Sequence, residues 1–132
     1  MNPIFLLHGK TLCIRRLKQT DLQHAYYEVM SLLSEIDRTI LRTRGILNTL
    51  ENEYIYFMVE DINTKMIIGT GTIIIANAST QYCQVGYIEN IIIRQDYQNI
   101  GLDDIVYQHL NYYCFNVKKC IRVVTNYRHE TS

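Results

Sequence analysis

The alternation of hydrophobic and polar positions in the first half of the chain predicts one strand followed by two helices. Residues 11–17 (TLCIRRL) alternate loosely and are rich in branched side chains, which is typical of a strand. Apolar residues then recur at helical spacing over residues 21–33. Thr20 stands three residues before Gln23, which is the capping-box spacing at a helix start. A weaker helical pattern covers residues 37–50.

The middle of the chain has the composition of strands that are joined by short connections. Residues 54–60, 66–75 and 82–93 are rich in branched and aromatic side chains, whereas residues 61–65 and 76–81 are mostly polar. Connections of this length join antiparallel strands, so this region predicts consecutive hairpins. Two glycines within the second of these strands, Gly69 and Gly71, indicate a β-bulge or a close approach of another segment.

The last third of the chain predicts a strand–helix–strand crossover. Residues 94–100 form a polar loop, a helix follows it, and residues 120–126 form a final strand. The element order β-α-α-β-β-β-α-β indicates an α/β fold, with a mixed, mostly antiparallel sheet flanked by helices in one domain over residues 1–132. The apolar positions that define the helix are Leu102, Ile105, Val106, Leu110 and Tyr113.

Composition and charge then exclude several kinds of protein. Lys plus Arg (13) equal Asp plus Glu (13), so the chain lacks the basic surplus of proteins that coat nucleic acid. No apolar run reaches the roughly 18 residues that a membrane span needs, and the N-terminus lacks the pattern of a secretory signal. The four cysteines show neither C-x-x-C spacing nor neighbouring histidine pairs. We therefore expect a cytoplasmic protein with no metal, nucleic-acid or membrane ligand.

The loop before the last predicted helix is a candidate anion site. It runs from Tyr97 to Gly101, and the glycine permits a close approach of the backbone. Free N–H groups and the helix dipole make the N-terminus of a helix favourable for phosphate. An ordinary β–α turn that requires one glycine explains these residues equally well.

Five segments of the chain carry family motifs in a fixed order. They are IRRLKQTDL (14–22), KMIIGTGTIII (65–75), GYIENIII (86–93), YQNIGLDD (97–104) and KKCIRVV (118–124). Together they resemble the GCN5-related N-acetyltransferase (GNAT) superfamily and, within it, the glucosamine-6-phosphate N-acetyltransferases. The resemblance covers roughly residues 12–125 and implies a GNAT fold. The family continues with an N-x-x-F-Y-x-K-x-G-F segment that this sequence lacks, so we expect a C-terminally shortened version.

The resemblance also implies an activity and a set of site residues. The family transfers the acetyl group of acetyl-CoA to the amine of glucosamine 6-phosphate by direct attack, in a homodimer, for UDP-N-acetylglucosamine synthesis. Glu89, Asn90 and Asn126 lie where the family has its catalytic residues, and Glu89 would orient the amine or accept its proton. The implied contacts to acetyl-CoA are Ile91, Ile92, Ile93, Gln98, Asn99, Ile100, Gly101, Leu102 and Asp103.

Backbone groups would supply most of these implied contacts. The main chain of Ile91 and Ile93 would bond the pantetheine, and N–H groups between Gln98 and Asp103 would meet the pyrophosphate. The N–H near Ile91 would stabilise the tetrahedral oxyanion.

Four positions depart from the family pattern. Asn90 replaces an aspartate, Asp103 replaces a glycine, Asp104 stands where a basic residue is common, and Asn126 replaces an acidic residue. Carboxylates at the helix start suit the helix dipole but repel a pyrophosphate. Two other functions are therefore considered: a catalytically silent GNAT-fold domain that binds CoA or a partner protein, and an acetyltransferase for another small amine.

Overall fold

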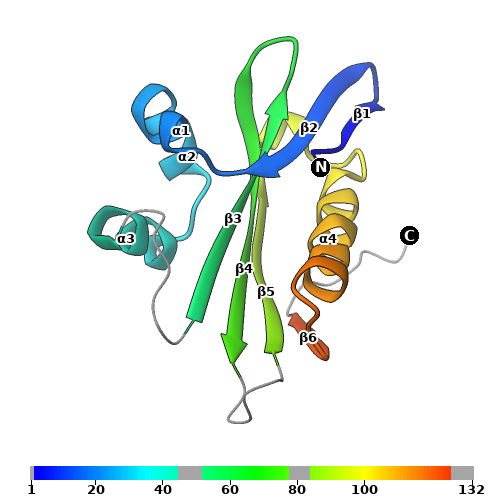
Figure 1. Ribbon diagram of the computed structural model, residues 1–132. Coiled ribbons are helices and arrows are strands. Elements are labelled where there is room, and N and C mark those ends of the chain that lie inside the picture. Colours follow the sequence, from blue (N-terminus) through cyan, green and yellow to red (C-terminus); the bar gives the residue numbers. More distant parts are fainter. Residues whose placement is uncertain (1, 45–51, 78–83, 126–132) are drawn as a thin grey trace.

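A computed structural model describes residues 2–44, 52–77 and 84–125, and its centre is one six-stranded sheet (Figure 1). The strands lie side by side in chain order, antiparallel except for the last pair, which is parallel. The strands are β1 (Ile4–Leu7), β2 (Lys10–Arg16), β3 (Asn52–Asp61), β4 (Met66–Asn77), β5 (Gln84–Ile93) and β6 (Arg122–Thr125). The helices are α1 (Gln19–His24), α2 (Tyr26–Ser31), α3 (Glu35–Arg44) and α4 (Leu102–Tyr112), with a 3₁₀ turn η1 (Gln95–Tyr97) and a π-helical turn η2 (Tyr113–Val117).

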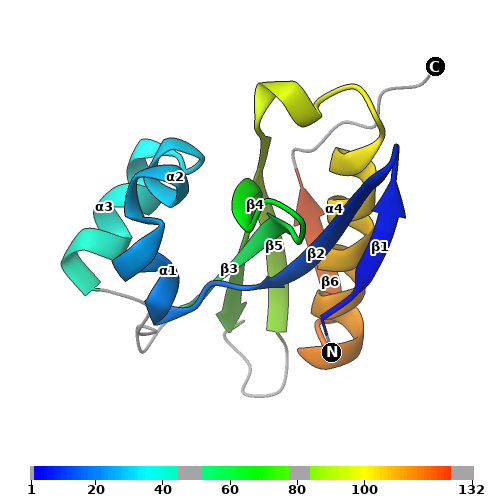
Figure 2. The ribbon, with the colours of Figure 1, turned by 90° about the horizontal axis from the view of Figure 1, so that it is seen from above.

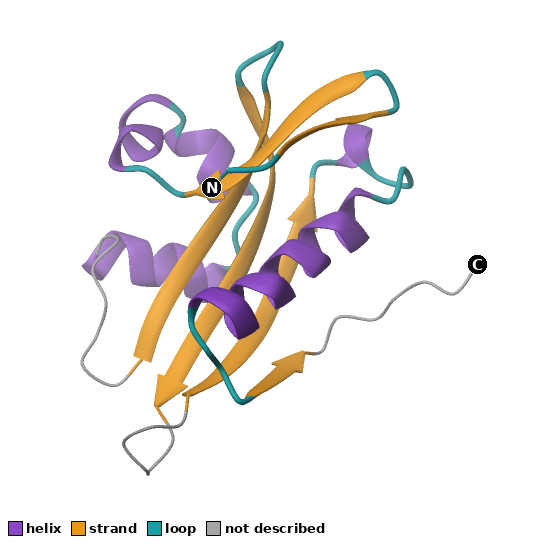
Figure 3. Ribbon diagram, turned by 45° about the vertical axis from the view of Figure 1, so that its right-hand side comes forward, coloured by secondary structure: helices purple, strands orange, loops and turns teal. Residues whose placement is uncertain are grey.

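Helices cover both faces of this sheet, with α1, α2 and α3 on one face and α4 on the other (Figures 2 and 3). Two apolar clusters fill the two layers, one that includes Val106 and Leu110 of α4 and one that includes Val29 of α2. Gly71 lets α4 approach β4 closely, because a Cβ atom there would meet Leu110 Cδ1 at 2.6 Å. The α/β fold expected from the sequence is confirmed.

The structure adds a strand that the sequence pattern does not predict. Strand β1 pairs with β2 through a tight turn at His8 and Gly9, both with positive φ (48° and 75°). Ile4 and Leu6 are 65% and 73% exposed, so β1 has apolar residues on its outer side as well as its inner side. A run of four apolar residues without alternation cannot be assigned to a strand or a helix by periodicity alone.

The single helix expected over residues 21–33 is wrong, because the chain bends at Ala25 (φ −129°, ψ 30°) and forms α1 and α2. The helix also begins before the expected cap at Thr20. The Lys18 N–H donates to Asp21 Oδ2 at 2.8 Å, so Asp21 provides the capping carboxylate. Helix α3 likewise begins before the expected residue 37, and the rest of that expected helix lies outside the described residues.

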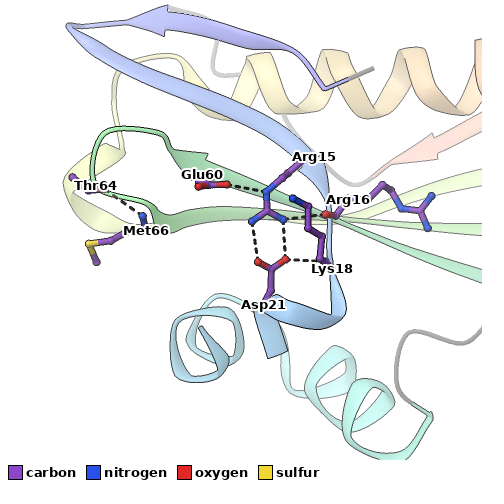
Figure 4. A network of polar contacts seen from close by, with 7 residues as sticks. All are labelled: Arg15, Arg16, Lys18, Asp21, Glu60, Thr64 and Met66. Carbon is purple, nitrogen blue, oxygen red and sulfur yellow. Dashed lines mark hydrogen bonds and ion pairs between the residues drawn. The ribbon is translucent and has the colours of Figure 1, made fainter. Parts of the chain in front are cut away.

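A buried ionic network joins α1 to the sheet (Figure 4). Arg15 donates to both Asp21 oxygens at 2.8 and 2.9 Å and to Glu60 Oε1 at 2.9 Å. Burial raises the pKa of Asp21, but the bonds from Arg15 and Lys18 outweigh it and hold the pKa below its usual value. This pair therefore stabilises the fold above the unfolded pKa of about 3.9, and the contribution is lost as pH falls through the folded value.

Candidate active site

Strand β5 is irregular where the sequence motif places its polar pair. The register against β4 shifts by one residue, so that Thr72 alone lies opposite both Glu89 and Asn90. Two residues facing one define a β-bulge, which bends the strand and redirects its side chains and backbone groups. The two expected catalytic residues of β5 therefore lie together in a bulge.

Beyond this bulge, β5 leaves its parallel neighbour. The last pair between β5 and β6 joins Ile88 to Thr125, and β5 continues to Ile93. Among the described residues, no strand pairs with that side of β5 from Glu89 onward. Unpaired N–H and C=O groups on a strand edge can bond an extended ligand. The expected pantetheine contacts, Ile91 to Ile93, lie along this edge.

The expected pyrophosphate loop follows at the end of β5. Gln98 Nε2 donates to the Ile93 carbonyl at 2.8 Å, which holds the loop against the strand. Asn99 and Gly101 both have positive φ (64° and 81°), and Ile100 between them is half-buried. Gly101 is the N-cap of α4 and makes no side-chain cap hydrogen bond. Backbone N–H groups at this helix start therefore form an anion-binding geometry.

The first turn of α4 limits how a ligand could be bound. Leu102 is fully buried in the core, so only its backbone can meet a ligand. Asp103 and Asp104 add two carboxylates to the same turn, and both are half-buried. Their charges interact favourably with the helix dipole and unfavourably with a phosphate.

A buried hydrogen bond that the sequence does not reveal fixes the start of this loop. The Tyr97 hydroxyl donates to Asp61 Oδ2 at 2.6 Å, and Asp61 Oδ1 accepts the Asn63 N–H at 3.0 Å. The bond from Tyr97 lowers the pKa of Asp61, while burial and that carboxylate raise the pKa of Tyr97 to about 12. The pair thus connects the loop to the β3–β4 hairpin.

We expect Tyr97→Phe to lower the free energy of unfolding by about 2 kcal/mol, the typical value of a hydrogen bond to a charged group. If this loop binds acetyl-CoA, as the family resemblance implies, its loosening should also raise the KM for acetyl-CoA several-fold at unchanged kcat. Denaturant unfolding and steady-state kinetics measure the two effects. Tyr112→Phe, on the exposed side of α4, is the control. Equal KM values for Tyr97→Phe and the wild type would contradict a role in the loop.

On the other face of the sheet, Asp37 joins three strands to α3. This carboxylate is 4% exposed and accepts hydrogen bonds from Tyr56 (3.4 Å), Thr72 (3.2 Å), Asn90 (3.3 Å) and Ser34 (3.0 Å). Burial, and then the Asp37 carboxylate, raise the pKa of Tyr56, so its phenol remains a donor. Sequence patterns do not reveal Asp37, because it lies in a weak helical pattern and far along the chain from its partners on the sheet.

The Glu89 side chain, beside Asn90 in the bulge, is half-buried and makes no hydrogen bond or ion pair with any described residue. It is therefore available to a ligand. Asn126, the third expected catalytic residue, lies outside the described residues. Within residues 2–44, 52–77 and 84–125, no three His, Cys, Asp or Glu side chains are grouped to hold a metal ion. No helix in that part of the chain is long and apolar enough to span a membrane.

Solved structures share the fold of this chain over most of their length. A glucosamine-6-phosphate N-acetyltransferase from Arabidopsis thaliana matches with a TM-score of 0.64 and 18% identity, over 92% of this chain and 85% of that one. A GNAT family acetyltransferase from Staphylococcus aureus matches with a TM-score of 0.65 and 14% identity, over 92% and 94%. An aminoglycoside N-acetyltransferase crystallised with CoA matches with a TM-score of 0.66 and 18% identity, over 96% and 83%. The chain therefore has the fold of the GNAT acetyltransferases.

The description of one curated relative names a particular substrate. A Drosophila melanogaster protein described as a probable glucosamine 6-phosphate N-acetyltransferase is 25% identical over 97 residues. The match covers 70% of this chain and 44% of that protein, so this chain spans less than half of the relative's length. No family model matches the chain. The resemblance that the motifs indicate is confirmed by this relative and by the solved structures.

Proposed function

We propose that this chain is an acetyltransferase that transfers the acetyl group of acetyl-CoA to the amine of glucosamine 6-phosphate. The proposal rests on three consecutive backbone segments, which run from the bulge at Glu89 to the start of α4. Bulge, unpaired edge and helix N-terminus follow one another in the order in which a thioester, its pantetheine and a pyrophosphate occur in acetyl-CoA. The residues present fit this cosubstrate, since Gly101 has positive φ at the start of α4 and carries no side chain that could cover the backbone N–H groups there.

The chemistry follows from this placement. The N–H of Ile91, next to the bulge, would stabilise the negative charge on the carbonyl oxygen when the amine nitrogen attacks the thioester carbon. Glu89 would accept a proton from that nitrogen, directly or through water. The C–S bond then breaks, the thiolate of CoA leaves, and the amide product forms. No covalent enzyme intermediate is required, so positioning of the two substrates supplies much of the acceleration.

Two findings support an amino sugar as the acceptor. The Drosophila relative carries glucosamine 6-phosphate in its name, and aminoglycoside acetyltransferases are among the proteins that share this fold. The second group favours another amino sugar as the alternative substrate. The resemblance also underlies our proposal of a homodimer, which light scattering would test. The composition and the N-terminal pattern underlie our proposal of a cytoplasmic location, which imaging would test.

Product formation from acetyl-CoA and glucosamine 6-phosphate tests the proposal directly. We expect N-acetylglucosamine 6-phosphate, detected by mass spectrometry, at a rate far above the enzyme-free control. Mass detection avoids interference from the protein's own cysteines, of which the sequence has four. Acetylation of another amino sugar, and not of glucosamine 6-phosphate, would contradict the proposed substrate and support the proposed acetyl transfer. No product from folded protein with any amine, together with acetyl-CoA binding, would favour the silent domain.

A further inference from the structure

Asp37 is a buried carboxylate whose hydrogen-bond partners among the described residues are all uncharged. Its donors are three side-chain hydroxyl groups and one amide, and no Lys, Arg or His among the described residues forms an ion pair with it. A buried charge without a cation is costly unless several hydrogen bonds replace its hydration. The arrangement therefore depends on these particular donors being held around it.

Two of those donors belong to the bulge itself. Thr72, from β4, lies opposite Glu89 and Asn90, the two bulged residues of β5. Both donate to the same oxygen, Oδ2, at 3.2 and 3.3 Å. One carboxylate oxygen thus joins the two strands at the place where their register shifts. Ladder pairing is disrupted at a bulge, so side-chain bonds of this kind can define its conformation.

We propose that Asp37 is a positioning residue that holds the β5 bulge in place through its hydrogen bonds to Asn90 and Thr72. Asn90 lies between Glu89 and Ile91, so fixing Asn90 also fixes the carboxylate and the backbone N–H on either side of it. The catalytic consequence of this inference rests on the proposed function, whereas its structural consequence does not.

A purely structural role for Asp37 makes a different prediction. Asp37 also takes part in capping α3, because its N–H donates to Ser34 Oγ at 3.2 Å and Ser34 donates back to its carboxylate at 3.0 Å. Capping stabilises the helix and does not require Asn90. A variant pair that changes the bond between Asp37 and Asn90 separates the two roles.

The donor and the acceptor of that bond can be exchanged by substitution, because Asn90 donates it and Asp37 accepts it. In Asp37→Asn, an amide replaces the carboxylate, and its NH₂ group can then face the NH₂ group of Asn90, so that two donors meet. In Asn90→Asp, a second carboxylate faces Asp37 across a bond that is now 3.3 Å long. The double variant Asp37→Asn/Asn90→Asp restores one carboxylate and one amide with their positions exchanged. Glu35→Gln removes one exposed carboxylate from the same helical turn and serves as the matched control.

Two measurements on the full chain test the positioning role of Asp37. The first is the backbone amide ¹H–¹⁵N shifts of Glu89, Asn90 and Ile91, which report the bulge without any turnover. The second is kcat at saturating acetyl-CoA. We expect both single variants to move the amide shifts and to lose about 10-fold in kcat, a typical coupling between contacting residues. The double variant should recover most of the wild-type amide shifts and most of the wild-type kcat. Glu35→Gln should change neither the amide shifts nor kcat.

Unchanged amide shifts in Asp37→Asn would overturn the inference, as would a double variant no better than the singles at equal thermal stability. If the wild type gives no product but the amide shifts move and recover as expected, the proposed function fails and the positioning role stands. If the wild type is active and Asp37→Asn keeps its full kcat, the catalytic consequence of Asp37 is wrong while the proposed function stands.

Discussion

Gly101→Val is expected to abolish measurable acetyl-CoA binding, with the Kd raised about 100-fold or more. Gly101 has φ of +81°, where a β-branched side chain is strained by roughly 1–3 kcal/mol. A Cβ atom at this position would meet nothing within 4 Å, so the strain comes from the backbone and not from a clash. Relief of that strain would turn the N–H groups at the start of α4 away from the pyrophosphate. Isothermal titration with acetyl-CoA measures the loss.

The control for this variant places the same β-branched residue at a positive-φ position near the other end of α4. Lys119 also has positive φ (57°), is exposed, and follows η2, the turn that continues α4. Lys119→Val should lower the melting temperature and leave the Kd for acetyl-CoA within about twofold of the wild type, since the change lies outside the loop. If Gly101→Val binds acetyl-CoA as tightly as Lys119→Val does, the α4 N-terminus is not the phosphate site.

Glu89→Ala is expected to lower kcat about 100-fold, the lower end of the usual range for a general acid–base group. The Kd for acetyl-CoA should stay nearly unchanged, because the proposed cosubstrate contacts are backbone groups further along the chain. Glu89 has no protein partner among the described residues, so its removal should cost little stability. Steady-state kinetics and titration with acetyl-CoA separate these effects.

The pH dependence distinguishes proton transfer from simple orientation of the amine. If Glu89 accepts the proton, the defect of Glu89→Ala should shrink as pH rises, since more of the amine is then already deprotonated. Glu35→Ala, which removes an exposed carboxylate from α3, should retain the wild-type rate at every pH. Full activity of Glu89→Ala across the pH range would show that the assigned role is wrong.

Much of the fold could be predicted because its signals are local. The three central strands alternate or run apolar between short polar connections, so β3, β4 and β5 form the expected hairpins. The apolar spacing after Gly101 likewise predicts α4, whose buried residues include Val106 and Leu110. Where the pattern is short or ambiguous, as at β1 and Ala25, the boundaries depend on tertiary contacts and the predictions miss them.

The candidate site also has some features that the sequence reveals and others that it does not. The motif around Glu89 and Asn90 and the glycine at 101 are visible in the sequence, because each is contained in a few consecutive residues. Asp37 and Asn90 are 53 residues apart, and Asp61 and Tyr97 are 36 apart. A hydrogen bond between such distant residues leaves no periodic trace in the sequence.

Local patterns are thus enough to predict the strands and helices with strong periodicity, the last crossover and the resemblance to the GNAT acetyltransferases. They do not predict that Thr72 faces a bulge, that β5 leaves β6 at Ile88, or that Asp37 lies against both strands. Side-chain periodicity records only which face of an element is buried. The register between strands and the pairing of buried polar groups are set only when the distant segments pack together.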